Sequence, residues 1–236
     1  MKHQTPLQPQ TGTPLQAPGD RISRAVVESP PVAPETPAYR FFRRAFDLVF
    51  GTVILFLVFP VVPLLVFMIR MDSPGPILFR QIRVGQGGKP FTFYKFRSMF
   101  VAADQRVGEL AALNEAGGPV FKMRDDPRIT AVGRFLRRSS LDEIPQIINV
   151  LKGDMSIVGP RPALPSEVSR YEPWHRRRLD ARPGLTCLWQ ISGRSHIGFD
   201  EWMRLDLEYL RTRSNWTDLV IVLKTIPAVM ARRGAY

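Results

Sequence analysis

The stretch from Leu48 to Ile69 reads LVFGTVILFLVFPVVPLLVFMI and contains no charged side chain in 22 residues. A straight helix of this length would reach about 33 Å at 1.5 Å per residue, enough to cross a bilayer core of ~30 Å. Pro60 and Pro63 interrupt it, and each removes a backbone donor. Basic residues flank the stretch on both sides, so we expect both ends on the cytosolic side. The pattern predicts a re-entrant helix hairpin that breaks at Pro60.

Two other interpretations of this stretch stay open from the residues alone. A straight membrane span with a proline kink is one, because neighbouring groups can satisfy the freed backbone. A buried core helix of a soluble protein is the other, although such helices are rarely apolar all round.

Around the apolar stretch the chain divides into three parts. Residues 1–38 hold eight of the 22 prolines and predict a disordered tail with no cleavable signal peptide. Residues 39–72 form the membrane-inserted segment, and residues 73–236 are expected to form a cytosolic domain.

The composition limits the classes of possible binding partner but does not select one of them. The 236 residues include 33 basic and 21 acidic side chains, a formal net charge of +12. Such a charge points to nucleic acid, acidic lipid headgroups or phosphorylated substrates. A single cysteine, Cys187, excludes an intrachain disulfide and any multi-cysteine metal site.

The cytosolic part predicts an α/β fold of the α+β kind that is mostly helical. Two β-rich runs, 77–84 and 91–97, flank a glycine-containing turn and predict a β-hairpin. Because that turn joins two strands, it does not fit a phosphate-binding loop. Residues 101–118 predict a helix followed by a loop. The apolar period returns from Ile129, and a further helix is expected from Ser139 to Lys152, ending at Gly153.

Three further amphipathic segments follow, at 172–178, 199–211 and 216–230. Their mixture of Trp, Tyr and Arg suits helices at a lipid interface, and ordinary packing on a core explains it equally well.

The adjacent acids Asp142 and Glu143 are the strongest candidate for chemistry. Ser140 followed three residues later by Glu143 matches a capping box, which would give both acids a structural role. Alternatively, an ionised Asp facing Arg137 and Arg161 could attack phosphorus while the arginines bind phosphate oxygens. A second carboxylate beside it could hold Mg²⁺, which bridges a pyrophosphate.

Seven short runs carry a family resemblance that no single one would establish. They are Lys95–Met99 (KFRSM), Asp125–Thr130 (DDPRIT), Ser140–Gln146 (SLDEIPQ), Asn149–Ser156 (NVLKGDMS), Gly159–Pro162 (GPRP), Arg182–Thr186 (RPGLT) and Ser192–Arg194 (SGR). With these runs the chain, from about Arg43 to Tyr236, resembles the bacterial sugar transferase family, also called monotopic phosphoglycosyl transferases. Cys187 departs from the family, which usually has Gly at this position.

The resemblance implies a covalent mechanism. Asp142 would attack the β-phosphorus of a UDP-sugar, release UMP and hold a phospho-sugar. Undecaprenyl phosphate would then accept the sugar-1-phosphate, of the hexose type, and so initiate an exopolysaccharide or glycoconjugate repeat unit. Glu143 would be the Mg²⁺ ligand. Further residues implied in substrate binding or support of the site are Lys95, Arg137, Arg161, Arg194 and Asp206.

The resemblance also implies a location and partners. The re-entrant helix, broken at Pro60, would hold a cytosolic catalytic domain at the bacterial inner membrane, among membrane lipids. The donor sugar and a homodimer stay open. Two other functions compete with the enzyme. A non-catalytic scaffold of polysaccharide assembly would not need the acid pair and its arginines. A membrane-tethered nucleic-acid binder would need a basic groove with stacking aromatics, and no such module is readable.

Overall fold

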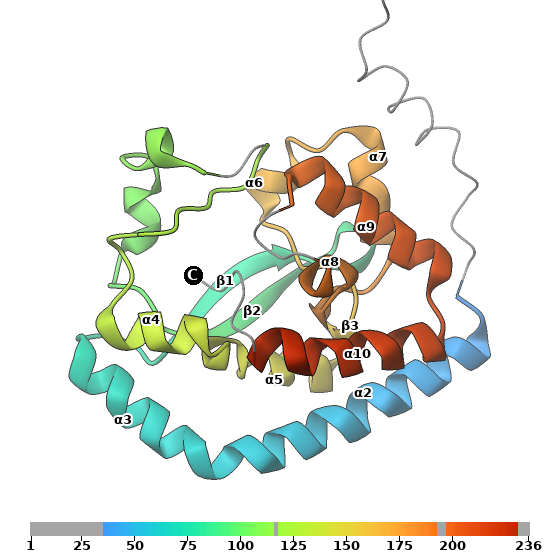
Figure 1. The fold of residues 1–236 in the computed structure, drawn as a ribbon, viewed down its shortest axis with the longest axis horizontal. Helices are drawn as coiled ribbons and strands as arrows, with labels where there is room; N and C mark the ends of the chain where they lie inside the picture. The colour runs from blue at the N-terminus through green and yellow to red at the C-terminus, as the bar shows by residue number, and fades with distance from the viewer. Residues whose placement is uncertain (1–34, 116–117, 193–196, 231–236) are drawn as a thin grey trace, which may run out of the picture. The chain divides into compact units, whose positions relative to one another are not determined.

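The computed structural model describes residues 35–115, 118–192 and 197–230. Of the predicted tail, residues 1–34 therefore lie outside the described residues. The described chain is a mixed α/β fold, mostly helical, with two small two-stranded sheets (Figure 1).

The apolar stretch forms one bent helical segment, Pro37–Asp72, which we call the apolar segment. It consists of α2 (Pro37–Val58), a single 3₁₀ turn η1 (Phe59–Val61) and α3 (Val62–Asp72). The two helices meet at an angle at η1 (Figure 1). Pro60 lies inside that turn, where its missing N–H and its ring disfavour continuous α-helix. The predicted break therefore falls at the predicted residue.

The surface of the apolar segment is poorly covered by protein. Its most apolar 18-residue window is only 11% buried, and Phe56, Phe59 and Phe67 are well exposed. A core helix of a soluble protein would be mostly buried, so that alternative is wrong. The apolar segment is long and apolar enough to cross a membrane.

A β-hairpin follows, as the sequence predicts. Strands β1 (Leu78–Val84) and β2 (Pro90–Phe96) pair antiparallel, with Leu78 opposite Phe96 and Val84 opposite Pro90. The turn between them contains the 3₁₀ element η2 (Gln86–Gly88). The second sheet pairs β3 (Ser156–Val158) with β4 (Gly184–Thr186) in parallel.

Helices fill the space around the strands. The longer ones are α4 (Ala131–Arg138), α5 (Gln146–Lys152), α9 (Phe199–Thr212) and α10 (Asn215–Met230). Short elements connect them: η3 (Ala103–Val107), η4 (Ala111–Leu113), η5 (Leu141–Glu143), α6 (Pro165–Val168), α7 (Pro173–Arg176), η6 (Arg177–Asp180) and α8 (Leu188–Ile191).

Three buried clusters hold these elements together, and two of them reach the strands. One joins β2, α5, β3, α9 and α10 through residues such as Phe93, Val150 and Tyr209. The other joins α3 to β2 and α4 through Ile69, Phe96 and Leu136. The apolar segment is thus packed at its α3 end against the domain that follows it.

Two predicted helices differ from the structure. The helix expected within 101–118 is replaced by the short 3₁₀ elements η3 and η4, which begin after a left-handed Ala102. The helix expected from Ser139 begins only at Gln146, because Pro145 lacks the N–H that an earlier start would need. Its stop at Gly153 is confirmed, since Gly153 adopts the left-handed C-cap conformation (φ +90°).

Candidate active site

The acid pair lies on the tight turn between α4 and α5. Ser140 adopts a left-handed conformation (φ +57°), and Leu141–Glu143 then form the 3₁₀ turn η5. Ser140 makes no side-chain cap, so the capping box expected from its spacing to Glu143 is wrong. Asp142 is only 4% exposed, and the Glu143 side chain is 20% exposed. The turn leaves both carboxylates available to groups from other elements.

Two cations from distant parts of the chain meet Glu143. Lys95, near the end of β2, places Nζ 2.9 Å from Glu143 Oε1 and 3.4 Å from Asp142 Oδ2. Arg161, in the turn after β3, donates from Nη1 and Nη2 to the same Glu143 oxygen at 3.0 and 3.1 Å. The structure thus brings together four of the residues that the sequence singles out.

Arg137 approaches from the last turn of α4. Its Nε donates to Ser98 Oγ at 3.0 Å, which holds the guanidinium beside the cavity that Asp142 also lines. Burial raises the pKa of Asp142, and the positive charge of Arg137 partly opposes that effect. Ser98 was not assigned a role from the sequence, although it belongs to the quoted KFRSM run.

The charges around the pair set the two pKa values apart. Burial raises the pKa of Asp142, and the charges of Lys95 and Arg137 offset this only in part. Burial also acts to raise the pKa of Glu143, but Lys95 and Arg161 oppose it more strongly and hold that pKa well below its usual range. Glu143 is therefore firmly ionised. Asp142 has the higher pKa of the two and is the carboxylate that takes up a proton first as the pH falls.

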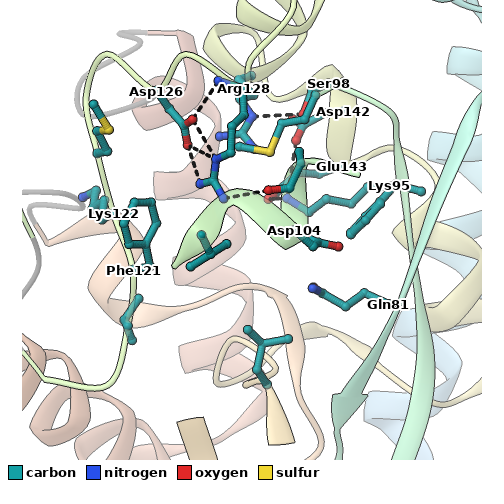
Figure 2. Close-up of a pocket in the computed structure, with 18 of the residues that line it drawn as sticks. Gln81, Lys95, Ser98, Asp104, Phe121, Lys122, Asp126, Arg128, Asp142 and Glu143 are labelled. Carbon is teal, nitrogen blue, oxygen red and sulfur yellow. Dashed lines mark hydrogen bonds and ion pairs between the residues drawn. The ribbon is translucent and has the colours of Figure 1, made fainter. Parts of the chain in front are cut away.

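A cavity of about 1340 Å³ opens beside these residues. Its lining includes all five of Lys95, Arg137, Asp142, Glu143 and Arg161. Figure 2 shows Asp142, Glu143 and Lys95 on one wall and Phe121 and Lys122 on the segment across from them. Aromatic and basic side chains together suit a ligand that carries both a ring and anionic groups.

A buried ion pair on the cavity wall was not identified from the sequence patterns. Arg128 donates to both oxygens of Asp126, with Nη2 2.6 Å from Oδ2, and its Nη1 reaches Ala103 O at 3.2 Å (Figure 2). This pair holds the segment around η3 next to the acid turn. Its residues occur in the DDPRIT run, which gave the family resemblance but no role for either side chain.

Asp206 lies behind the site rather than in it. It is 1% exposed and paired with Arg178, whose Nε is 2.8 Å from Asp206 Oδ2. Arg178 in turn donates from Nη2 to the backbone oxygen of Arg161 at 2.7 Å. Asp206 therefore supports Arg161 through Arg178. No pattern in the sequence indicated this role of Arg178. Arg194, the remaining predicted site residue, lies outside the described residues.

The donor set is compatible with a divalent cation shared with substrate. Within the described residues, no three His, Cys, Asp or Glu side chains gather to form a complete cage. Asp142 and Glu143 supply two adjacent carboxylates. Mg²⁺ is commonly bound by one or two carboxylates, with substrate phosphates and water as its remaining ligands. The residues present therefore fit Mg²⁺ only together with a phosphorylated ligand.

Comparison with known proteins finds similarity along most of the chain. The profile described as Bacterial sugar transferase matches residues 38–232. The chain is 43% identical over 201 residues to the undecaprenyl-phosphate galactose phosphotransferase of Salmonella typhimurium, covering 84% of this chain and 42% of that protein. It is 41% identical over 204 residues to the UDP-glucose:undecaprenyl-phosphate glucose-1-phosphate transferase of Caulobacter vibrioides, covering 82% and 72%.

A shorter relative matches along most of its length. The chain is 39% identical over 198 residues to the exopolysaccharide production protein ExoY of Rhizobium meliloti, covering 82% of this chain and 88% of that protein. By contrast, the chain spans about two fifths of the length of several curated relatives that it matches.

Proposed function

The chain belongs to the bacterial sugar transferase family, and on that premise we propose that it transfers a hexose-1-phosphate from a UDP-sugar to undecaprenyl phosphate. The observation that carries the proposal is the buried Asp142 beside an ionised Glu143, with Lys95, Arg137 and Arg161 lining one cavity. Relatives named for galactose and glucose transfer support a hexose donor.

The first half-reaction forms a bond between Asp142 and phosphorus. A carboxylate oxygen of Asp142 attacks the β-phosphorus of the UDP-sugar, the bond from that phosphorus to the bridging oxygen breaks, and UMP leaves. Asp142 then carries the sugar phosphate as an acyl phosphate. Lys95, Arg137 and Arg161 bind phosphate oxygens and stabilise the charge that spreads over the transferring group.

The second half-reaction restores the carboxylate. An oxygen of undecaprenyl phosphate attacks the same phosphorus, the bond to Asp142 breaks, and the polyprenyl-diphosphate sugar is released. A phosphate acceptor held at the membrane and a water-soluble donor must both reach Asp142. The lining of the large cavity begins at Pro76, four residues after the apolar segment ends, which supports such a meeting.

Mg²⁺ is part of this proposal. Glu143, with Asp142 next to it, would hold the ion against the pyrophosphate, where the ion neutralises negative charge and improves the leaving group. Removing divalent cations with EDTA should abolish UMP release, and added Mg²⁺ should restore it. Full activity in EDTA would refute the need for the ion.

A re-entrant topology is the form of membrane attachment that the contacts favour. Arg43, near the start of α2, contacts β3, while Asp72, at the end of α3, contacts α4. Both ends of the apolar segment therefore touch the domain formed by the residues after it. A straight crossing would put its ends on opposite faces, about 30 Å apart. Positive charge on both flanks favours the cytosolic face of the inner membrane for this domain.

The decisive experiment traps the covalent intermediate. The purified chain, incubated with UDP-galactose or UDP-glucose without acceptor, should gain one hexose phosphate on the peptide that contains Asp142. Asp142→Asn should show neither the adduct nor UMP release, while the exposed control Glu208→Ala should show both. An unmodified Asp142 peptide during active turnover would refute the nucleophile.

A further inference from the structure

The groups of the proposed site come from four separate elements. Lys95 is on β2, Arg137 is in the last turn of α4, the Asp142–Glu143 turn precedes α5, and Arg161 follows β3. These elements are short, and only Ser139 and Ser140 link α4 to η5. Contacts with other parts of the molecule must therefore help to fix the spacing between these elements.

The α2 helix binds the C-terminal end of α5. Both terminal nitrogens of Arg44 donate to the last-turn carbonyls of α5, Nη1 to Val150 O and Nη2 to Leu151 O, each at 2.7 Å. A guanidinium here adds a donor to carbonyls of the last turn, where Val150 O also accepts from Gly153 N, and it complements the helix dipole. Gly51 permits close packing, since a Cβ there would lie 3.2 Å from Leu151 Cδ2.

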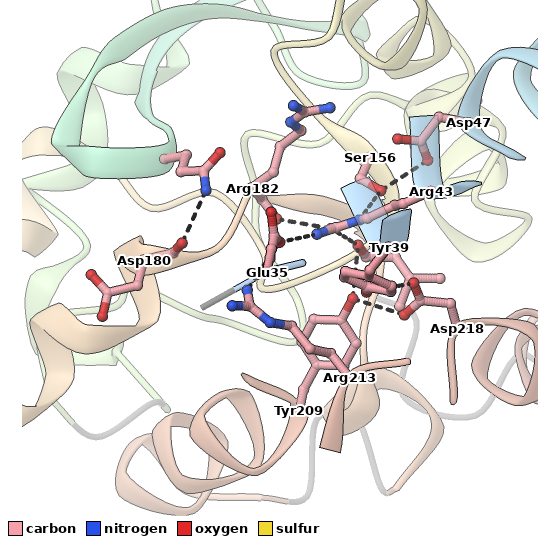
Figure 3. Close-up of polar contacts among 12 residues, drawn as sticks. Glu35, Tyr39, Arg43, Asp47, Ser156, Asp180, Arg182, Tyr209, Arg213 and Asp218 are labelled. Carbon is pink, nitrogen blue, oxygen red and sulfur yellow. Dashed lines mark hydrogen bonds and ion pairs between the residues drawn. The ribbon is translucent and has the colours of Figure 1, made fainter. Parts of the chain in front are cut away.

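The same helix also binds β3 through buried charges (Figure 3). Asp47 Oδ1 accepts from Ser156 Oγ and from Ile157 N, both at 2.8 Å. Arg43 donates from Nε to Ser156 Oγ at 3.0 Å and from Nη2 to Val158 O at 2.6 Å. Arg161 lies three residues after Val158, so this contact fixes the strand that presents it.

The α3 end makes the matching contacts on the other side of the bend. Asp72 Oδ2 accepts from Val132 N, in the first turn of α4, at 3.1 Å. Arg97, two residues after Lys95, donates from Nη2 to Ile69 O at 3.2 Å and also to Ser73 O. The first turn of α4, the end of α5, strand β3 and the residue that follows β2 are thus tied by hydrogen bonds to the apolar segment. The Asp142–Glu143 turn directly precedes α5 in the chain.

We propose that Arg44 and Asp72 are positioning residues that couple the bend of the apolar segment to the spacing between Arg137 and the Asp142–Glu143 turn. Arg44 holds α5 from one arm and Asp72 holds α4 from the other. A change in the angle at η1 would therefore change the distance between α4 and α5, and with it the distance between Arg137 and the Asp142–Glu143 turn. This inference rests on the proposed function, because it assigns the two contacts to the geometry of that reaction.

The test measures steady-state UMP release by the full chain in nanodiscs that contain undecaprenyl phosphate, with UDP-galactose or UDP-glucose as donor. Arg44→Ala and Asp72→Ala each remove one tie. Arg44→Lys and Asp72→Asn keep a donor or an acceptor at the same place. Arg40→Ala and Glu208→Ala remove exposed charges of the same sign elsewhere and serve as matched controls.

We expect each alanine variant to lose about 10-fold to 100-fold in kcat, because a displacement of about 1 Å at a reacting group costs up to that much. The KM for the UDP-sugar should change by less than about 2-fold, since the lining residues remain. The lysine and asparagine variants should recover most of kcat, and the controls should match the wild type.

Three results would overturn the proposal. The alanine variants could fold and keep wild-type kcat. The conservative variants could be no better than alanine. The alanine variants could also lose the cooperative thermal transition that the controls retain, in which case the ties hold the fold and not the site. Inactivity of the wild-type chain with every donor would instead refute the proposed function.

Discussion

Substituting Gly133 by alanine should misplace Arg137 without touching it. Gly133 lies in the first half of α4 and is packed directly against the backbone of Ser98. A Cβ at this position would lie 2.0 Å from Ser98 O, 2.6 Å from Ser98 C and 2.8 Å from Ser98 Cα. Ordinary contact begins near 3.4 Å, so α4 or the segment around Ser98 must retreat by more than 1 Å.

That retreat acts on the site through one hydrogen bond. Arg137 Nε donates to Ser98 Oγ at 3.0 Å, and a shift of this size would break it. We expect kcat to fall by up to about 100-fold, the loss that a misplacement of about 1 Å can cause. Overpacking should cost about 1–3 kcal/mol of stability, and the better helix propensity of alanine should return at most about 1 kcal/mol of that.

The assay compares Gly133→Ala with Gly108→Ala, a glycine whose Cβ would meet nothing within 4 Å. UMP release gives kcat, and circular dichroism during heating gives the midpoint of unfolding. The control should resemble the wild type in both. Wild-type kcat in a folded Gly133→Ala protein would refute the role of α4 packing in placing Arg137.

Three further outcomes are expected. Ser140→Gly should raise the unfolding midpoint by about 2–4 °C, because glycine relieves roughly 1 kcal/mol of left-handed strain at φ +57°; an unchanged or lower midpoint would contradict this. The raised pKa of Asp142 should put the acid limb of kcat/KM above the ordinary value of 3.8, since the protonated acid cannot attack, and a profile flat down to that value would contradict it. Burial raises the pKa of Asp206 to about 6 against the opposing effect of Arg178, so the stability due to this group is full below the unfolded pKa of about 4 and is lost as pH rises through 6. Going from pH 7.5 to 5, the wild type should therefore gain about 1 kcal/mol relative to Asp206→Asn, and equal midpoint shifts in thermal unfolding would contradict it.

Local patterns predicted the parts of the fold that local physics controls. The apolar stretch, its break at Pro60, the β-hairpin and the stop at Gly153 depend on residues close in sequence, and all four are present. The helix predicted within 101–118 is wrong because residues close in sequence do not determine the conformation of this segment. Its backbone is fixed by long-range contacts, such as the hydrogen bond from Arg128 Nη1 to Ala103 O, which override its helical propensity.

The site could be predicted only as far as its motifs reach. The acid pair and Arg161 were found as carboxylates set among arginines, and Lys95 was found in a run typical of a known family. The structure brings these residues into contact. The chain Asp206–Arg178–Arg161 could not be found in this way. It joins a helix, a 3₁₀ turn and a loop by two contacts whose partners lie 28 and 17 residues apart. Contacts between residues that lie this far apart leave no periodic pattern in the sequence.

The acid turn shows why the structural and the chemical interpretations of one motif exclude each other. A capping box would use the Ser140 hydroxyl to cap the Glu143 N–H and the Glu143 carboxylate to cap the Ser140 N–H. The left-handed conformation of Ser140 prevents this, and Pro145 delays the helix, so neither carboxylate is used as a cap. Glu143 turns instead to Lys95 and Arg161. Strained backbone at such a position costs about 1–3 kcal/mol and persists only where the surroundings enforce it. Here the enforced conformation keeps Asp142 out of a capping role and on the cavity wall beside Lys95, which favours the chemical role of the pair.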